Sequence, residues 1–312
     1  MKVLVAGATG AIGRRLTPVL VREGHDVVGM TRSESKVPLL RSLGAEPVVC
    51  DALAAEKVRA AVAAADPDVI IHQLTDLPGR LKPNRLARYY AANNRVRKEG
   101  TLNLLAGARE VGVGRMIAQS AAFWYRPEGG MVKTEADPMH TEAGPPIGEA
   151  ARTMQEIESA LLAEPDVNAV SLRYGAFYGP GTWYAARGDI GRQVAIRRYP
   201  LVGRGEGVTS FVHIDDAAEA TVAALRAPPG VYNVADDEPA RLNDWLPAFA
   251  KALGARPPRR VPASLARMLV GSAPVEWLET QRGADNTKAK RDLDWRLRYP
   301  TWRDGFLTGL GD

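Results

Sequence analysis

Short apolar runs alternate with segments of helical periodicity up to about residue 180. The apolar runs predict strands at Lys2–Ala6, Asp26–Thr31, Glu46–Cys50, Val69–Leu74, Arg115–Ser120 and Ala169–Tyr174. The segments between them predict helices at Ile12–Glu23, Ala54–Ala65 and Asn84–Gly112, with a further helix inside Pro146–Ala163. Because strands that alternate with helices connect by right-handed crossovers, we expect an α/β fold. Its doubly wound parallel sheet should carry helices on both faces.

The regular alternation ends near Gly175. Glycine and proline gather afterwards, at Tyr178–Gly181, Pro200–Gly207 and Pro228–Gly230. The remaining patterns predict helices at Asp215–Arg226 and Asn243–Leu253 and a strand at Gly230–Val234. No repeat or low-complexity linker divides the chain. We therefore expect one domain over residues 1–175, with some later segments returning to it, and a smaller interleaved cap formed mainly by residues 176–312.

Three glycines join the first predicted strand to the first predicted helix. Gly7, Gly10 and Gly13 are spaced G-x-x-G-x-x-G, which permits a tight turn and lets backbone N–H groups approach a pyrophosphate at the helix N-terminus. The position of the motif in an alternating α/β chain makes it specific. It predicts a Rossmann-like dinucleotide-binding domain. The predicted pyrophosphate site comprises Gly7, Thr9, Gly10, Ala11, Ile12 and Gly13.

The end of the second predicted strand bears on which dinucleotide is bound. Sites for NAD usually place Asp or Glu here, where the carboxylate binds the ribose hydroxyls. This chain has Thr31 followed by Arg32, Ser33 and, slightly later, Lys36. Because a guanidinium can bind a 2′-phosphate that a carboxylate would repel, we expect NADP(H) to be preferred over NAD(H). Asp51, after the third strand, is a candidate acceptor for the adenine amino group.

Composition excludes several classes of protein. The 312 residues hold 41 Lys+Arg and 36 Asp+Glu, a net charge of +5. The arginines are scattered and form no basic stripe with interleaved aromatics, which argues against nucleic-acid binding. No charge-free apolar run reaches the ~18–20 residues of a membrane span, and the N-terminus lacks a signal-peptide pattern. The single cysteine, Cys50, excludes a disulfide framework within the chain and favours a cytoplasmic location.

Several motifs beyond the glycines together point to one group of proteins. They are Val69–His72, Gly100–Leu105, Ser120–Trp124, Leu172–Tyr174, Tyr178–Gly181, Ser210–Asp216 and Asn286–Lys290 with Leu293 and Trp295. With them the chain resembles the extended short-chain dehydrogenase/reductase superfamily, in its epimerase/dehydratase-like group. Thr209 and Ser210 stand where sugar-nucleotide members usually carry an arginine, which disfavours a nucleotide-sugar substrate.

The resemblance implies further site residues. It adds Ala52, Gln73, Leu74, Thr75, Arg97, Tyr174 and Gly175 to the cofactor-binding set. It implies a substrate pocket near Trp124, Phe177, Trp183 and His213 in the cap, for a small-molecule substrate. Nothing in the sequence indicates a metal site. The resemblance also implies a homodimer through the two long helices, although their Arg-rich surfaces leave a monomer open.

The family's usual catalytic pair is missing. Members carry Tyr and Lys spaced Y-x-x-x-K, on one face of the helix after the fifth strand, where the ammonium lowers the phenol pKa. None of the nine lysines in this chain has a tyrosine four residues before it. Ser120 remains where relatives orient the reacting oxygen. Tyr125 is a candidate proton donor, with a place in the pocket wall as the alternative.

Three functions are compatible with these observations. The first is an NADP(H)-dependent oxidoreductase with a non-standard proton donor, which acts on a small organic metabolite, with an aromatic one as an option. Hydride transfer needs no tyrosine when the substrate is already activated and is oriented beside the nicotinamide. The second is a redox-neutral isomerase or dehydratase that retains the cofactor. The third is a catalytically silent NADP(H)-sensing regulator.

Overall fold

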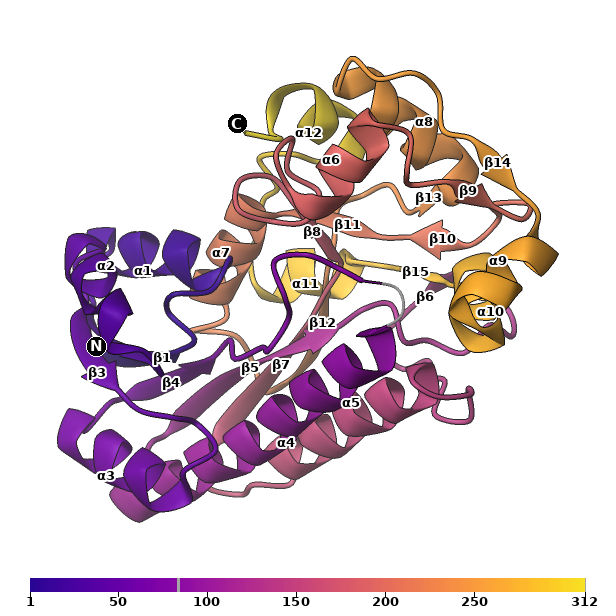
Figure 1. Ribbon diagram of the computed structural model, residues 1–312. Helices are drawn as coiled ribbons and strands as arrows, with labels where there is room; N and C mark the ends of the chain where they lie inside the picture. The colour runs from indigo at the N-terminus through magenta and orange to yellow at the C-terminus, as the bar shows by residue number, and fades with distance from the viewer. Residues whose placement is uncertain (83–84, 312) are drawn as a thin grey trace.

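The protein is built on one seven-stranded parallel sheet, seen in a computed structural model that describes residues 1–82 and 85–311 (Figure 1). The strand order is β12-β7-β5-β4-β1-β2-β3. The strands are β1 (Lys2–Ala6), β2 (Asp26–Thr31), β3 (Glu46–Val49), β4 (Val69–His72), β5 (Arg115–Ala121), β7 (Asn168–Tyr174) and β12 (Gly230–Val234). The order reverses between β1 and β4, where α/β proteins bind ligands beyond the carboxyl ends of the strands. The predicted fold class is confirmed.

Helices cover both faces of the sheet (Figure 1). One face carries α1 (Gly13–Arg22) and α7 (Ile214–Ala223), together with α11 (Thr287–Asp292). The other face carries α3 (Ala55–Ala65), α4 (Leu86–Val111) and α5 (Ile147–Leu162). Each face therefore buries its own apolar cluster, as expected for parallel strands with few polar positions.

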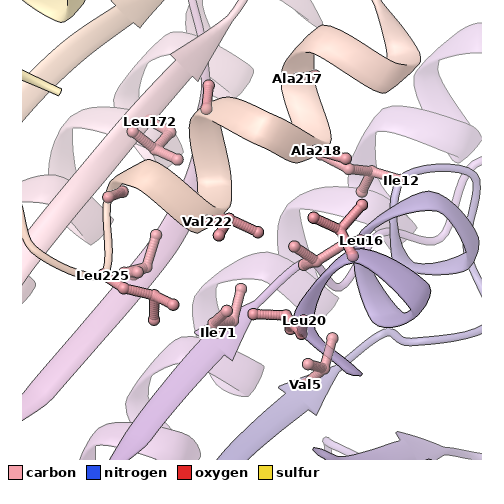
Figure 2. Close-up of a cluster of buried hydrophobic side chains, with 14 of the residues drawn as sticks. Val5, Ile12, Leu16, Leu20, Ile71, Leu172, Ala217, Ala218, Val222 and Leu225 are labelled. Atoms are coloured by element: carbon pink, nitrogen blue, oxygen red, sulfur yellow. The ribbon is translucent and has the colours of Figure 1, made fainter. Parts of the chain in front are cut away.

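Figure 2 shows the packing of α1 and α7 on the sheet. Leu16 and Leu20 of α1 lie against Val5 and Ile71 of the central strands, and Val222 of α7 completes the layer. All five side chains are buried. Helix α7, which begins 40 residues after the end of β7, thus packs beside α1. It helps to hold the glycine turn at the start of α1.

The later part of the chain builds a second layer above the carboxyl edge of the sheet (Figure 1). Its helices are α6 (Asp189–Ala195), α8 (Leu242–Ala252), α9 (Ala263–Val270), α10 (Ser272–Thr280) and α12 (Trp302–Thr308). Its short strands are β8 (Ala176–Tyr178), β9 (Leu201–Val202), β10 (Val208–Thr209), β11 (Phe211–His213), β13 (Ala240–Arg241), β14 (Arg260–Val261) and β15 (Gly283–Ala284), which pairs with β6 (Val132–Lys133). Its aromatic core includes Tyr178, Phe211, Trp245, Phe249 and Trp302.

Most predicted elements form, with shifted ends. The strands Lys2–Ala6, Asp26–Thr31 and Gly230–Val234 have the predicted bounds. The fourth strand ends at His72 rather than Leu74, because the Leu74 N–H turns back to His72 Nδ1 at 3.0 Å. The helix predicted from Asn84 begins at Leu86 in the structure, and Asn84 itself lies outside the described residues. Short elements such as α2 (Val37–Ser42) and most of the later layer were not predicted, since two to nine residues carry little periodicity.

Within the ranges 1–82 and 85–311, no helix combines the length and the apolar character needed to cross a membrane. The same ranges contain no cluster of three or more His, Cys, Asp or Glu side chains suited to a metal ion.

Candidate functional site

The glycine turn lies between β1 and α1 and has room for nothing larger than hydrogen at two positions. Gly7 has φ of +92°, and a Cβ there would lie 2.6 Å from the Gln73 carbonyl oxygen. A Cβ on Gly13 would overlap the Gly7 carbonyl. Gly10 and Ala11 are exposed. In the described part of the chain, no backbone hydrogen bond starts from the amides of Ala11 or Ile12. A tight turn with free amides at a helix N-terminus fits a dinucleotide pyrophosphate.

The end of β2 presents basic side chains to solvent. Arg32 is 70% exposed in its side chain, and its Nη2 lies 3.1 Å from Oδ1 of Asp76, which follows β4. Ser33 Oγ bonds Ser35 Oγ at 2.8 Å, and Lys36 is exposed in the short helix η1 (Glu34–Lys36). An exposed ion pair of this kind contributes only about 0–1 kcal/mol. Arg32 can therefore exchange Asp76 for a phosphate at little cost.

The residues predicted around the middle of the dinucleotide divide into exposed and buried groups. Asp51 and Thr75 are exposed, and Asp51 Oδ1 accepts from the Leu53 N–H. Ala52 and Leu74 lie close to Gly100 of α4, with Ala52 buried. The Leu74 backbone also approaches Gly7, whereas the Ala52 carbonyl oxygen accepts from Asn103 of α4 at 2.8 Å.

Gln73 and Tyr174 support the floor of the site from within the core. Gln73 Nε2 donates to the Tyr174 hydroxyl at 3.1 Å, and that hydroxyl also bonds Thr221 of α7 at 2.7 Å. Burial raises the pKa of Tyr174 above its usual range. Phe177 packs on the Tyr174 ring, with centroids 5.1 Å apart. Gly175 is needed next to them, because a Cβ there would lie 2.7 Å from the Ser210 carbonyl oxygen.

The carboxyl end of β5 carries Ser120, a residue that is only 2% exposed. Its Oγ has no hydrogen-bond partner among the residues that the structure describes. Three side chains from the first turns of α5, Ile147, Ala151 and Met154, pack into the apolar cluster on this face of the sheet. Ile147 and Ala151 are spaced four residues apart. No tyrosine or lysine occurs in α5. The helix that bears the catalytic pair in relatives is therefore apolar on its inner face in this chain.

Tyr125 is held in a buried polar network. Its hydroxyl donates to Asn233 Oδ1 at 2.6 Å and accepts from Arg173 Nη1 at 2.9 Å. Arg173 in turn forms a buried ion pair with Glu158, at 2.6 Å. Burial raises the pKa of Tyr125 to about 12 despite the nearby Arg173. These contacts favour a structural role over the predicted role as proton donor.

An aromatic cluster lies between β5, α4 and α10. Trp124 contacts Tyr90, Phe123 and Trp277, with ring centroids 5.9, 4.8 and 5.6 Å away. The Trp277 Nε1–H donates to the Phe123 carbonyl oxygen at 3.1 Å. Tyr90 and Trp277 were not predicted as site residues, because neither belongs to a motif and Trp277 lies more than 150 residues after Trp124. Trp124 itself is 5% exposed, so the cluster is a buried apolar wall four residues beyond Ser120 along the chain.

Two residues predicted for the substrate pocket have other roles in the structure. Trp183 Nε1 donates to the Pro78 carbonyl oxygen at 3.0 Å and so ties the segment after β4 to the later layer. The predicted place of His213 in the substrate pocket does not agree with its contacts. Its Nδ1 accepts from the Asp215 N–H and caps α7, while its Nε2 donates to the Gly309 carbonyl oxygen at 2.9 Å. With both nitrogens engaged and 1% exposure, His213 has no polar atom left for a substrate.

Arg97 is buried on α4 without a carboxylate partner. Its residue exposure is 6%, its Nη1 lies 3.1 Å from the Met154 sulfur, and its Nε has no partner in the described ranges. Burial lowers its pKa to about 10. Next to it, His72 accepts from the Leu74 N–H and donates to Thr101, whose hydroxyl donates to the Arg97 carbonyl oxygen. Burial, and then the charge of Arg97, lower the pKa of His72 to about 4. His72 is therefore neutral, and Arg97 carries the charge.

Together, the doubly wound sheet and the glycine turn define the class: a dinucleotide-binding α/β protein. The family model described as "NAD dependent epimerase/dehydratase family" matches residues 3–235. The chain belongs to this family, within the extended short-chain dehydrogenase/reductase superfamily, which confirms the resemblance inferred from its motifs. A nicotinamide cofactor and an enzyme of this type follow from that membership.

Relatives and solved structures agree with this assignment. A Streptomyces protein named 3-diazoavenalumate denitrifying reductase is 44% identical over 307 residues, covering 98% of this chain and 99% of the relative. A 2-alkyl-3-oxoalkanoate reductase of Stenotrophomonas maltophilia is 27% identical and covers 82% and 76%. Among structures, UDP-glucose 4-epimerase of Thermotoga maritima with UDP-glucose superposes with a TM-score of 0.79 at 21% identity, over 99% and 97% of the chains. A human epimerase family protein with NADPH gives 0.74 at 18%, over 99% of both chains.

Proposed function

We propose that this protein is an NADP(H)-dependent reductase that removes the diazo group of an aromatic substrate, replacing it with hydrogen and releasing N2. The observation that carries the proposal is the missing proton donor. The inner face of α5 presents Ile147 and Ala151, and the hydroxyl of Tyr125 is engaged with Arg173 and Asn233. A relative of 44% identity, which covers nearly the whole chain, is named as a denitrifying reductase of a diazo compound.

The chemistry of such a substrate explains why the acid is dispensable. Reduction of a ketone by hydride leaves an alkoxide that must gain a proton, which the family's tyrosine normally gives. An aryl diazonium ion that takes up hydride forms a C–H bond, while its C–N bond breaks and the electron pair leaves with N2. The sum is ArN2⁺ plus reduced cofactor giving ArH, N2 and oxidised cofactor, and no proton is consumed. When bound, the nicotinamide supplies the hydride.

The chain's own residues then bind and orient. The glycine turn at Gly7–Gly13 holds the pyrophosphate, and Arg32, Ser33 and Lys36 bind the 2′-phosphate, which favours NADP(H). Trp124 and its aromatic neighbours supply an apolar wall against which an aromatic ring can pack edge-on. Ser120 orients the reacting end with its free hydroxyl. Such orientation beside the nicotinamide accounts for a large part of rate enhancement in reactions of this kind.

A purified-protein assay with labelled substrates tests the proposal. The protein is mixed with NADPH, deuterated at C4 on either face, and an arenediazonium carboxylate whose diazo nitrogens carry an isotopic label. We expect equimolar loss of NADPH, labelled N2 by mass spectrometry, and deuterium at the former diazo carbon from one face only. Equal deuterium from both faces would indicate non-enzymatic reduction by free NADPH, and deuterium from neither face would mean that the new hydrogen does not come from the nicotinamide. Either result would contradict the proposal.

The same purified protein and NADPH distinguish the alternative functions predicted from the sequence, when other substrate classes are tested. Oxidation of NADPH by ketones but not by diazonium compounds would favour a carbonyl reductase like the two relatives of 25% and 27% identity named as a ketoreductase and an oxoalkanoate reductase. Tight NADPH binding with no turnover of either class would favour the sensing regulator. Product formation without net change in NADPH would favour a redox-neutral isomerase or dehydratase.

A further inference from the structure

Two arginines of this chain are buried near the carboxyl ends of the strands, and they differ in one respect. Arg173 on β7 has Glu158 at 2.6 Å. Arg97 on α4 forms no ion pair anywhere in residues 1–82 and 85–311, and one of its N–H groups reaches only the thioether of Met154. A thioether is a weak acceptor, and a guanidinium has five N–H donors. A buried charge without a counter-charge is costly, so its retention needs a reason.

The surroundings hold Arg97 in place and keep the site free of competing charge. The Leu74 N–H, His72, Thr101 and the Arg97 carbonyl oxygen form a continuous hydrogen-bond chain that anchors this turn of α4. His72 is neutral, since its Nδ1 accepts a hydrogen bond. The carboxylate of Glu158, four residues after Met154 on α5, is committed to Arg173. Among the residues that the structure describes, the neighbourhood of Arg97 thus contains a fixed cation and no buried anion paired with it.

The position of Arg97 favours a ligand at the nicotinamide half of the site. The glycine turn and Arg32, which would hold the pyrophosphate and the adenosine end, lie at β1 and β2. Arg97 lies between α4 and α5, beside His72 at the end of β4, and β5 with Ser120 is the adjacent strand. The resemblance implied a place for Arg97 among the cofactor-binding residues. Its packing against α5 places it instead on the side where the substrate would meet Ser120 and Trp124.

We propose that Arg97 is the counter-charge for an oxyanion of the substrate, a carboxylate or a phenolate, and that the enzyme selects diazo compounds that carry such an anion. The selection of diazo compounds rests on the proposed function. The oxyanion site at Arg97 does not depend on it. A diazonium group is cationic, so an unpaired guanidinium would repel a simple diazonium ion. A substrate with its own oxyanion pairs with Arg97 and presents a zwitterion with no net charge to the site.

Removing the guanidinium should separate function from stability. Arg97→Met keeps a long unbranched side chain but removes an unpaired buried charge, so the variant should unfold at the same or a higher urea concentration than the natural protein. A structural arginine would behave in the opposite way. Arg97→Lys keeps the charge without the planar fork and should retain part of the oxyanion binding. Glu156→Gln, on the exposed face of α5, is the matched control for both measurements.

The binding test uses three aromatic probes and does not require turnover. Cinnamate carries only a carboxylate, 4-nitrophenolate only a phenolate, and methyl cinnamate no charge; each is titrated by calorimetry with NADP⁺ present and absent. The natural protein should bind one of the two anions, and that result identifies which oxyanion is recognised. Arg97→Met should weaken this binding about 10- to 100-fold, as expected for hydrogen bonds to a charged group, and should leave methyl cinnamate unchanged. Loss of all three probes to the same extent, or binding of neither anion by the natural protein, would overturn the proposal.

A turnover test then links the oxyanion to the diazo substrate. The natural protein should reduce a diazonium compound that bears the recognised oxyanion far better than benzenediazonium, and Arg97→Met should reverse or abolish this preference. An unchanged preference in Arg97→Met would contradict the selection of zwitterionic substrates. If no diazonium compound is reduced but the anions still bind through Arg97, the proposed function fails while the oxyanion site stands.

Discussion

Nη2 of Arg173 lies 2.6 Å from Oε2 of Glu158, and both side chains are more than nine-tenths buried. The pair joins β7 to α5, and its guanidinium also holds the hydroxyl of Tyr125. Ser171 adds a hydrogen bond to Glu158 Oε1 at 3.2 Å. This network occupies the interior beneath the site and connects the sheet to the helix that bears catalytic residues in relatives.

Glu158→Gln should destabilise the protein strongly, because it leaves the buried guanidinium of Arg173 without a counter-charge. Breaking a buried pair by removing one partner costs about 3–5 kcal/mol. Urea unfolding followed by circular dichroism measures the effect. Glu156→Gln is the control two residues away, since it breaks an exposed pair with Lys98 that is worth about 0–1 kcal/mol. Equal losses in the two variants would mean that the Arg173 pair contributes no more than a surface pair.

Tyr125→Phe distinguishes a proton donor from a structural hydroxyl. We expect kcat to change less than about 2-fold, and the free energy of unfolding to fall by about 1 kcal/mol for the lost hydrogen bonds. If Tyr125 were a general acid, the variant would instead lose about 100-fold or more in kcat.

Ser120→Ala is the companion variant. Because the free hydroxyl of Ser120 should orient the substrate, its removal should lower kcat/KM about 10-fold with little change in stability. A large loss of kcat in Tyr125→Phe alone would restore the tyrosine as proton donor.

Arg32→Ala should weaken NADPH binding selectively. Loss of a charged hydrogen bond to the 2′-phosphate corresponds to about 10- to 100-fold in Kd, whereas NADH lacks that group and its Kd should stay nearly constant. Fluorescence titration with both cofactors measures this. Asp76→Asn is the matched control, because it releases Arg32 from its ion pair and should leave NADPH binding unchanged or slightly tighter. Equal weakening of both cofactors by Arg32→Ala would refute recognition of the 2′-phosphate.

His72 should make stability depend on pH in the acid range. Its pKa in the folded protein is about 4, below the value near 6.5 expected when unfolded. The stability it contributes is therefore present above about pH 6.5 and is lost as pH falls through about 4, up to roughly 3 kcal/mol. Urea unfolding at several pH values should show a shallower acid loss in His72→Gln than in the natural protein. Identical slopes in His72→Gln and the natural protein would contradict this role.

The homodimer and the division into residues 1–175 and 176–312 stay predictions. The structure adds that β12 lies at the edge of the sheet beside β7 and that α7 packs on α1. Later segments thus complete the first layer. The apolar pattern of Gly230–Val234 predicted a strand there. The pattern did not indicate that this strand pairs with β7.

The sequence by itself determined the sheet, the glycine turn and the lack of the Tyr–Lys pair. These features depend on local patterns: apolar periodicity, glycines at a fixed spacing, and residue identities four apart. The tertiary structure decided what each polar group faces. Arg97 and Arg173 look alike in sequence, yet only Arg173 meets a carboxylate. Likewise, Tyr125 is bound to Asn233, which lies 108 residues away. Burial and charge pairing depend on neighbours that are distant along the chain, so the sequence could not distinguish the occupied polar groups from the free ones.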